Sequence, residues 1–317
     1  MNEIVEVDAS PSPRLSSRRW LTTVIVIALL GAMAAQVVRT RDELASIERL
    51  SFATLGAASV LQFISQLFLN ASMLLPLRTC VRRLGFWELY IVRTGGLLVG
   101  SLVPVAGGVA VRLAYLRQRG VTYADFTWAT LLSNVLALAA AALVALFGTV
   151  MVWLFVGQPP AVVLAVAGGV FALSLVAIAV FESIPGLTRR TKLRRWAWLS
   201  NMPGLFTDGS MTLGVLLHSI GRHALNFVTY GLITQSLTGD FLTGGLVYAV
   251  TSPVRMVNIT PGNLGVTEWV VALVGQALAF DLTIGLIAAL AFRAVALIAQ
   301  AVGMAFGSAW MALGRGK

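Results

Sequence analysis

The chain has 317 residues, of which 58% are hydrophobic and 11% are charged, and its net charge at pH 7 is +10. A soluble domain carries about 25% charged residues, so this composition excludes an ordinary soluble enzyme or binding module. The basic residues gather at the ends of apolar runs, as expected for an inner-membrane protein, and do not form the aromatic-interleaved surface of a nucleic-acid-binding protein. We therefore expect an all-α polytopic protein of a cell inner membrane that has no nucleic-acid partner.

The first 19 residues are polar and include two prolines and three arginines. Such a segment cannot bury enough apolar surface to fold, and its arginines favour the cytoplasmic side. Residues 1–19 are therefore predicted to be a disordered cytoplasmic tail, and residues 20–317 a single transmembrane domain. The first two spans are expected at Trp20–Val38 and Ser51–Leu77.

The next apolar segment, Glu88–Val111, lies between an arginine-rich turn and Arg112, so both of its ends are expected in the cytoplasm. Its middle contains Pro104, Gly107 and Gly108, residue types that interrupt a helix. Each arm of about ten to twelve residues gives roughly 15–18 Å of helix, which reaches only the middle of a ~30 Å hydrocarbon core. The segment is therefore predicted to be a re-entrant helical hairpin.

The remaining full spans are expected at Tyr123–Val156, Ala161–Phe181, Met211–Leu237 and Leu282–Leu313. Between the last two, Phe241–Phe280 contains a second break at Pro261, Gly262 and Gly265. This segment can form either a hairpin that enters from outside or two short crossings, and its short arms favour the hairpin. The predicted topology has about six spans, two re-entrant hairpins and both termini in the cytoplasm.

This layout repeats itself. Residues 20–156 and residues 161–313 are each predicted to contain three full spans and one broken segment in the same order. The second copy is inverted in the membrane relative to the first. Inverted 3+3 repeats with broken segments at matching positions are typical of transporters, whose substrate site lies near the bilayer midplane. The alternative interpretation is that the breaks are ordinary interhelical turns.

Ionisable residues inside the apolar segments are few. Glu268 is the carboxylate predicted to lie well inside one, whereas the basic or amide candidates for the same site are Arg112, Arg255, Asn258 and Arg293. An uncompensated arginine at the bilayer centre costs at least ~2.5–3.5 kcal/mol on insertion scales, so these side chains require partners. Two hypotheses remain open: Glu268 pairs with Arg255 or Arg293 to hold the second hairpin together, or the surplus of arginine forms a cavity for an anionic ligand.

Motifs of catalysis are missing from the sequence. It contains no phosphate-cradling G-x-x-x-x-G-K-[ST] loop, no H-E-x-x-H pair and no aspartate-rich metal cluster. His218 and His223 are five residues apart, which does not place them on one face of a helix. We therefore expect no catalytic residues, no metal and no cofactor.

The two breaks resemble motifs of a known family. The first comprises Leu102–Gly108 (LVPVAGG) followed by Arg112–Leu116 (RLAYL), and the second comprises Thr260–Glu268 (TPGNLGVTE). They are similar to the signatures of the flippase-like membrane family, the transmembrane region of lysylphosphatidylglycerol synthases, without the cytosolic aminoacyl-transferase domain. The chain departs from the family pattern at Asn263, where glycine is frequent, and at Thr267, where a basic or polar residue is common.

The resemblance implies lipid translocation by a flippase or scramblase. Its substrate would be a membrane lipid with a phosphate headgroup, such as an aminoacylated phosphatidylglycerol, or a glycan on a polyprenyl-phosphate carrier. We do not expect this chain alone to synthesise a lysyl-lipid. The alternatives are a non-catalytic membrane subunit that partners an envelope-biosynthesis enzyme, either a glycosyltransferase or a lipid synthase, and an intramembrane enzyme.

Overall fold

The computed structural model describes residues 31, 48–81, 83–102, 107–157, 160–190, 203–205, 207–256 and 263–314. Every regular element in these residues is a helix, as predicted. The predicted tail and almost all of the predicted first span lie outside the described residues.

The described helices are, in chain order, α2 (Phe52–Cys80), α3 (Phe86–Leu102), α4 (Gly107–Gln118), α5 (Tyr123–Phe155), α6 (Ala161–Arg190), α8 (Gly209–Thr238), α9 (Phe241–Thr251), the 3-10 helix η3 (Ser252–Met256), α10 (Val266–Ala277) and α11 (Leu282–Gly314). Four of them contain stretches long and apolar enough to cross a membrane, at residues 52–80, 123–155, 161–186 and 282–313. These are four of the predicted spans. The protein is a membrane protein.

Short polar side chains set where several helices begin. The Thr122 hydroxyl accepts a hydrogen bond from the Asp125 N–H, and the Asp125 carboxylate accepts one from the Thr122 N–H, so α5 starts with a reciprocal cap. Asp208 caps α8 and Asp240 caps α9 in a similar way. Because the first N–H groups of a helix have no partner within it, these residues fix the boundaries between the apolar helices and their connections.

Two of the predicted helix ends were wrong. The first hairpin was predicted to end at Val111, but α4 continues to Gln118, so Arg112 lies within a helix. Arginine and leucine are good helix formers, and α4 stops only before Gly120, which adopts a positive φ of 87°. Similarly, α6 continues past Phe181 to Arg190.

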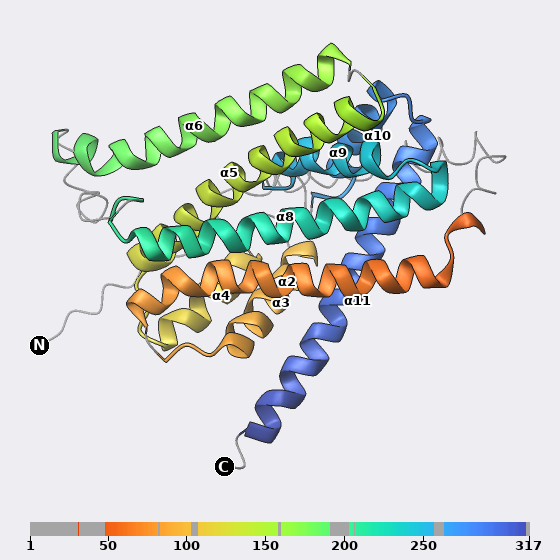
Figure 1. Ribbon diagram of the computed structural model, residues 1–317. Helices are drawn as coiled ribbons and strands as arrows, with labels where there is room; N and C mark the ends of the chain where they lie inside the picture. Colours follow the sequence, from red (N-terminus) through yellow and green to blue (C-terminus); the bar gives the residue numbers. More distant parts are fainter. Residues whose placement is uncertain are drawn as a thin grey trace, which may run out of the picture.

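The long helices α2, α5, α6 and α8 run alongside one another, and α11 crosses them (Figure 1). Glycines allow the closest approaches. A Cβ on Gly221 of α8 would lie 2.8 Å from the Phe68 ring of α2, and one on Gly245 of α9 would lie 2.4 Å from the Phe227 ring of α8. Small residues at helix contacts are the usual way in which membrane helices pack, because van der Waals contact there replaces the hydrophobic effect.

The two broken segments lie at opposite ends of this bundle. The α3–α4 pair lies where α5 begins, and the α9–α10 pair lies where α5 ends (Figure 1). The arms of the first pair pack so closely that a Cβ on Gly96 would lie 2.7 Å from the Gly108 carbonyl oxygen. At the open end of this pair, Arg119 forms an ion pair with Glu88 at 2.5 Å. The segments 103–106 and 257–262, which connect the two arms of the first and of the second pair, lie outside the described residues.

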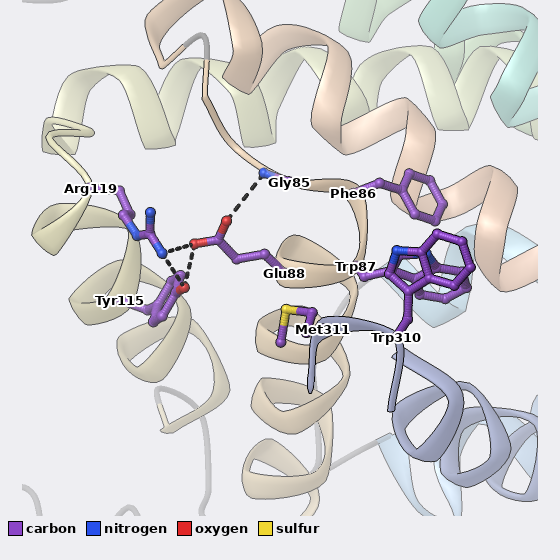
Figure 2. Close-up of a pocket in the computed structure, with 8 residues that line it drawn as sticks. All are labelled: Gly85, Phe86, Trp87, Glu88, Tyr115, Arg119, Trp310 and Met311. Atoms are coloured by element: carbon purple, nitrogen blue, oxygen red, sulfur yellow. Dashed lines mark hydrogen bonds and ion pairs between the residues drawn. The ribbon is translucent and has the colours of Figure 1, made fainter. Parts of the chain in front are cut away.

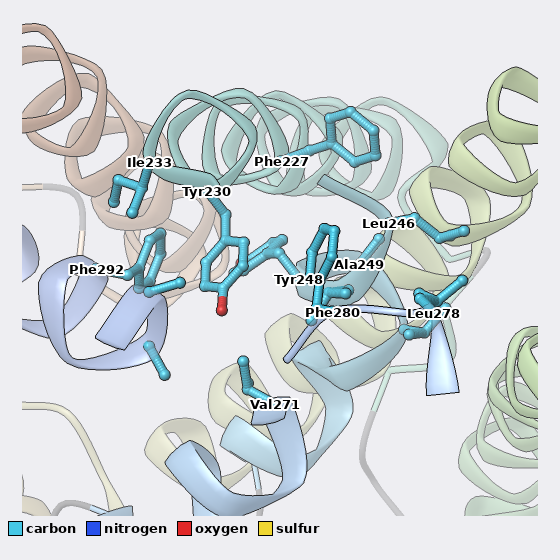
Figure 3. Packing of buried hydrophobic residues seen from close by; sticks show 14 of the residues in the cluster. Phe227, Tyr230, Ile233, Leu246, Tyr248, Ala249, Val271, Leu278, Phe280 and Phe292 are labelled. Carbon is cyan, nitrogen blue, oxygen red and sulfur yellow. The ribbon is translucent and has the colours of Figure 1, made fainter. Parts of the chain in front are cut away.

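Each pair is surrounded by its own apolar core. One core joins α8, α9, α10 and α11 around Tyr230, Tyr248 and Phe292 (Figure 3). The other joins α2, α3, α4 and α5 around Leu89 and Leu132. Between the two cores lies a set of polar side chains that we call the central polar layer: Gln62, Ser65, Gln66 and Asn70 of α2, Arg93 and Thr94 of α3, and Ser219, Arg222, His223 and Asn226 of α8.

Candidate functional site

The second break positions Glu268 at the start of α10. Gly265 precedes this helix with a positive φ of 82°, a conformation that favours glycine. Its N–H donates a hydrogen bond to Glu268 Oε2 at 2.7 Å, so the carboxylate folds back over the helix start. Asn263 also has a positive φ, of 53°. Asparagine tolerates this region better than most residues.

The second oxygen of Glu268 binds an arginine from the next helix. Arg293 of α11 approaches Glu268 Oε1 with both Nε and Nη2, each at 2.6 Å. Glu268 is 1% exposed, and it is the one acidic residue among the buried side chains of the described residues. Of the two partners considered for Glu268, the structure therefore pairs it with Arg293.

Arg255 lies beside this pair without joining it. Its guanidinium lies over the rings of Tyr248, at 5.4 Å, and Phe292, at 4.8 Å. The centres of these two rings are 5.5 Å apart, and Figure 3 shows both residues beside Tyr230 in the core. Arg255 Nε is buried and makes no hydrogen bond to any described residue. Asn263 connects the two arginines, because its Nδ2 donates to the Arg255 carbonyl at 3.3 Å and its own carbonyl accepts from Arg293 Nη2 at 3.4 Å.

A chain of hydrogen bonds leads from this region into the central polar layer. Asn226 Nδ2 donates to the Tyr248 hydroxyl at 2.8 Å, and Asn226 Oδ1 accepts from the Ser65 hydroxyl at 2.8 Å. The Tyr248 hydroxyl also lies 3.4 Å from His223 Nδ1. These hydrogen bonds connect Tyr248, whose ring lies under the Arg255 guanidinium, with polar groups of α8 and α2.

Arg112 does not contact Glu268. It lies on α4, where its Nε donates to the Gly108 carbonyl at 3.2 Å and its aliphatic part packs against Gly96. Gly107 forms the first residue of α4. Three other predicted residues, Asn258, Pro261 and Gly262, lie outside the described residues, as does Pro104 of the first break.

Sequence reasoning missed Arg93. This side chain is 1% exposed and is the largest among the fully buried side chains of the described residues. It lies in the apolar segment that was predicted as the first hairpin, where any arginine is costly. The criterion that selected Arg112 and Arg293 would have selected Arg93 as well.

The comparisons with known proteins agree with this architecture. The family model described as the lysylphosphatidylglycerol synthase transmembrane region matches residues 20–303. The chain belongs to this family. No curated protein and no solved structure matched it. Both breaks of this chain and the site around Glu268 lie within the residues that match the family model.

A separate cavity of about 380 Å³ lies at the open end of the α3–α4 pair, and Trp87 and Trp310 form one of its walls (Figure 2). Its polar side is formed by Glu88, which accepts hydrogen bonds from the Gly85 N–H at 3.2 Å and from the Tyr115 hydroxyl and pairs with Arg119. Glu88 and Glu268 therefore share one arrangement, in which one oxygen binds a glycine N–H at a helix start and the other binds an arginine. At Glu88 this arrangement joins the start of α3 to the end of α4, because Arg119 follows α4.

Proposed function

We propose that this protein moves a lipid with a phosphate-bearing, anionic headgroup across the cell membrane, as a flippase or scramblase. One observation carries the proposal: interior arginines outnumber interior carboxylates. Among the described residues, Arg93 and Glu268 are buried, and four further arginines within the bundle are partly buried: Arg112, Arg222, Arg255 and Arg293. Only Arg293 is neutralised by Glu268.

The surplus of positive charge matches the chemistry of a phosphate group. Guanidinium groups bind phosphate through two parallel hydrogen bonds, and this geometry is better suited to phosphate than the single charge of lysine. Charged groups inside a membrane protein are paired or mark the path of a substrate. An anionic headgroup provides the missing partner.

The arrangement of the helices supports an inverted topology. With the α3–α4 pair open towards the cytoplasm and the α9–α10 pair open towards the exterior, the multi-pass chain has both termini in the cytoplasm. Arg78, Arg83, Arg117 and Arg119 then lie on the cytoplasmic side, as the positive-inside rule requires. The two broken pairs extend towards the same central region from opposite faces.

The proposed mechanism is a competition between two anions. In the empty state, Glu268 occupies Arg293. A lipid phosphate that reaches Arg293 takes over these hydrogen bonds, and release of the carboxylate favours a different tilt of α10 against α11. A ligand shifts such an equilibrium only by its difference in affinity for the two states, so the exchange of partners at Arg293 is the required differential contact.

A reconstitution experiment tests the proposal. The purified protein is placed in phosphatidylcholine vesicles that contain a trace of phosphatidylglycerol with a fluorescent headgroup, and a membrane-impermeant quencher is added outside. Flipping predicts that fluorescence from the inner leaflet is also lost. A stop after the outer leaflet, as in protein-free vesicles, would contradict transport by the protein alone and favour the role of a non-catalytic subunit.

A further inference from the structure

We infer that Arg93 and Arg222 of the central polar layer, together with Arg112 of the neighbouring helix α4, form a second phosphate-binding site that is separate from the Glu268 site. This inference deepens the proposed function, on which its link to transport rests. It assigns to the α3–α4 pair a ligand site of its own.

The first support comes from the hydrogen bonds of Arg93. Its Nη2 donates to the Gln66 side-chain oxygen at 2.9 Å, and its guanidinium lies 5.5 Å from the centre of the Tyr90 ring. Its Nε is buried and has no hydrogen-bond partner among the described residues. A guanidinium that is fully buried but bonded only to neutral groups retains its whole positive charge, which an anion would neutralise.

The second support comes from the neighbours of Arg93, which add positive charge. Arg112 of α4 packs against Gly96, which follows Arg93 by three residues on α3, because a Cβ on Gly96 would lie 2.9 Å from Arg112 Cγ. Arg222 lies at the same level of α2, because Ser65 donates to the Arg222 carbonyl at 3.4 Å while the adjacent Gln66 binds Arg93. No carboxylate in the described part of the chain pairs with any of these three arginines.

The third support comes from further unsatisfied groups in the same layer. The hydroxyl of Thr94, next to Arg93 on α3, is buried and lacks a hydrogen-bond partner among the described residues. The side-chain oxygens of Gln62 and Asn70 on α2 are also buried and also lack a hydrogen-bond partner among the described residues. Unsatisfied polar groups are rare in protein interiors, so this concentration indicates a place that a polar ligand occupies.

The three arginines differ in their exposure. Arg112 and Arg222 are partly exposed, whereas Arg93 is fully buried. A phosphate group would first meet Arg112 and Arg222 and would reach Arg93 last. The layer lies between the two apolar cores, midway along α2 and α8, so a headgroup held there would be halfway between the two ends of the bundle.

Binding measurements test this site without relying on transport. The wild type, Arg93→Gln and the control Arg83→Gln are purified in dodecyl maltoside, and the melting temperature of each is measured with added dioleoylphosphatidylglycerol or inorganic phosphate. Arg83 is exposed and lies outside the bundle. We expect phosphatidylglycerol to raise the melting temperature of the wild type and of Arg83→Gln, with an apparent affinity at least about tenfold weaker for Arg93→Gln.

The two ligands separate the possible sources of the phosphate. Stabilisation by phosphatidylglycerol alone identifies a lipid headgroup, and equal stabilisation by inorganic phosphate identifies a free anion. If neither ligand stabilises the wild type, or if Arg93→Gln responds as strongly as the wild type, the inference is overturned. Arg222→Gln, at a partly exposed position, provides the same measurement if Arg93→Gln does not fold.

The outcomes also separate this inference from the proposed function. If the wild type binds phosphatidylglycerol through Arg93 but does not move it across vesicles, the transport proposal fails and the site stands. If the wild type moves the lipid and Arg93→Gln retains both binding and transport, the site fails and the transport proposal stands.

Discussion

Glu268 and Arg293 are 25 residues apart in the chain and form the ion pair that joins α10 to α11. Arg293 donates through both Nε and Nη2 to one carboxylate oxygen, and the Gly265 N–H occupies the other. The carboxylate thus connects the second break to the last helix. Mutations at this contact can therefore distinguish an effect on protein stability from an effect on lipid transport.

Replacing Glu268 with glutamine tests this separation. A glutamine oxygen can still accept hydrogen bonds, so we expect Glu268→Gln to cost about 1–2 kcal/mol of unfolding free energy. Glu268→Ala strands Arg293 and is expected to cost ~3–5 kcal/mol. We expect Glu268→Gln to lose transport nonetheless, because a neutral amide cannot exchange with a phosphate as the carboxylate does. Thermal stability and lipid flipping are measured on the same preparations.

The opposite result has a clear meaning. If Glu268→Gln melts much earlier than the wild type while the protein that survives transports normally, then Glu268 belongs to the scaffold and the exchange mechanism is wrong.

Arg293→Lys tests the need for a two-point contact. Lysine keeps the positive charge but cannot present the two fixed N–H donors that Arg293 directs at Glu268. Loss of one charge-assisted hydrogen bond predicts a decrease in transport rate of roughly tenfold. The matched control is Arg83→Lys, an exposed position where the rate is expected to remain that of the wild type. An unchanged rate in Arg293→Lys would show that charge alone is sufficient.

Gly96 provides a test of the α3–α4 contact. A Cβ there would lie 2.7 Å from the Gly108 carbonyl and 2.9 Å from Arg112 Cγ. Gly96→Ala is therefore expected to force the two helices apart, to lower stability by about 1–3 kcal/mol and to reduce transport. A Cβ on the adjacent Gly95 would meet no atom of another residue within 4 Å, so Gly95→Ala is the control and should be tolerated. Equal behaviour of the two variants would contradict the close packing of this pair.

Cysteine labelling tests the topology. Cys80 is the single native cysteine and its side chain is exposed, so it is first replaced with serine. In that background, a membrane-impermeant maleimide applied to intact cells should label Gln158→Cys, between α5 and α6, but not Arg119→Cys, at the end of α4. Gln158 itself lies outside the described residues. External labelling at Arg119→Cys would exclude a cytoplasmic opening of the α3–α4 pair and with it the inverted arrangement.

Much of the architecture could be predicted because it depends on local properties of the chain. Apolar length predicted membrane helices, and those at Phe52–Cys80, Tyr123–Phe155 and Leu282–Gly314 lie close to their predicted positions. Helix ends were less predictable, as at Gln118, where the arginines were expected to follow the helix and Arg112 and Arg117 instead lie within it. Arginine is compatible with a helix, so the actual end depends on Gly120 and its positive φ.

The sequence by itself determined that this is a helical membrane protein with too many interior arginines for its one interior carboxylate. Only the tertiary structure decided which arginine Glu268 binds. Arg255 is closer in the sequence, but the rings of Tyr248 and Phe292 hold its guanidinium, while α11 packs against α10 and brings Arg293 to the carboxylate. Arg93 acquires its significance in the same way, because its neighbours come from α2, α4 and α8. Hydrophobicity is a property of each segment and can be read along the chain, whereas the partner of a buried charge depends on how separate helices pack.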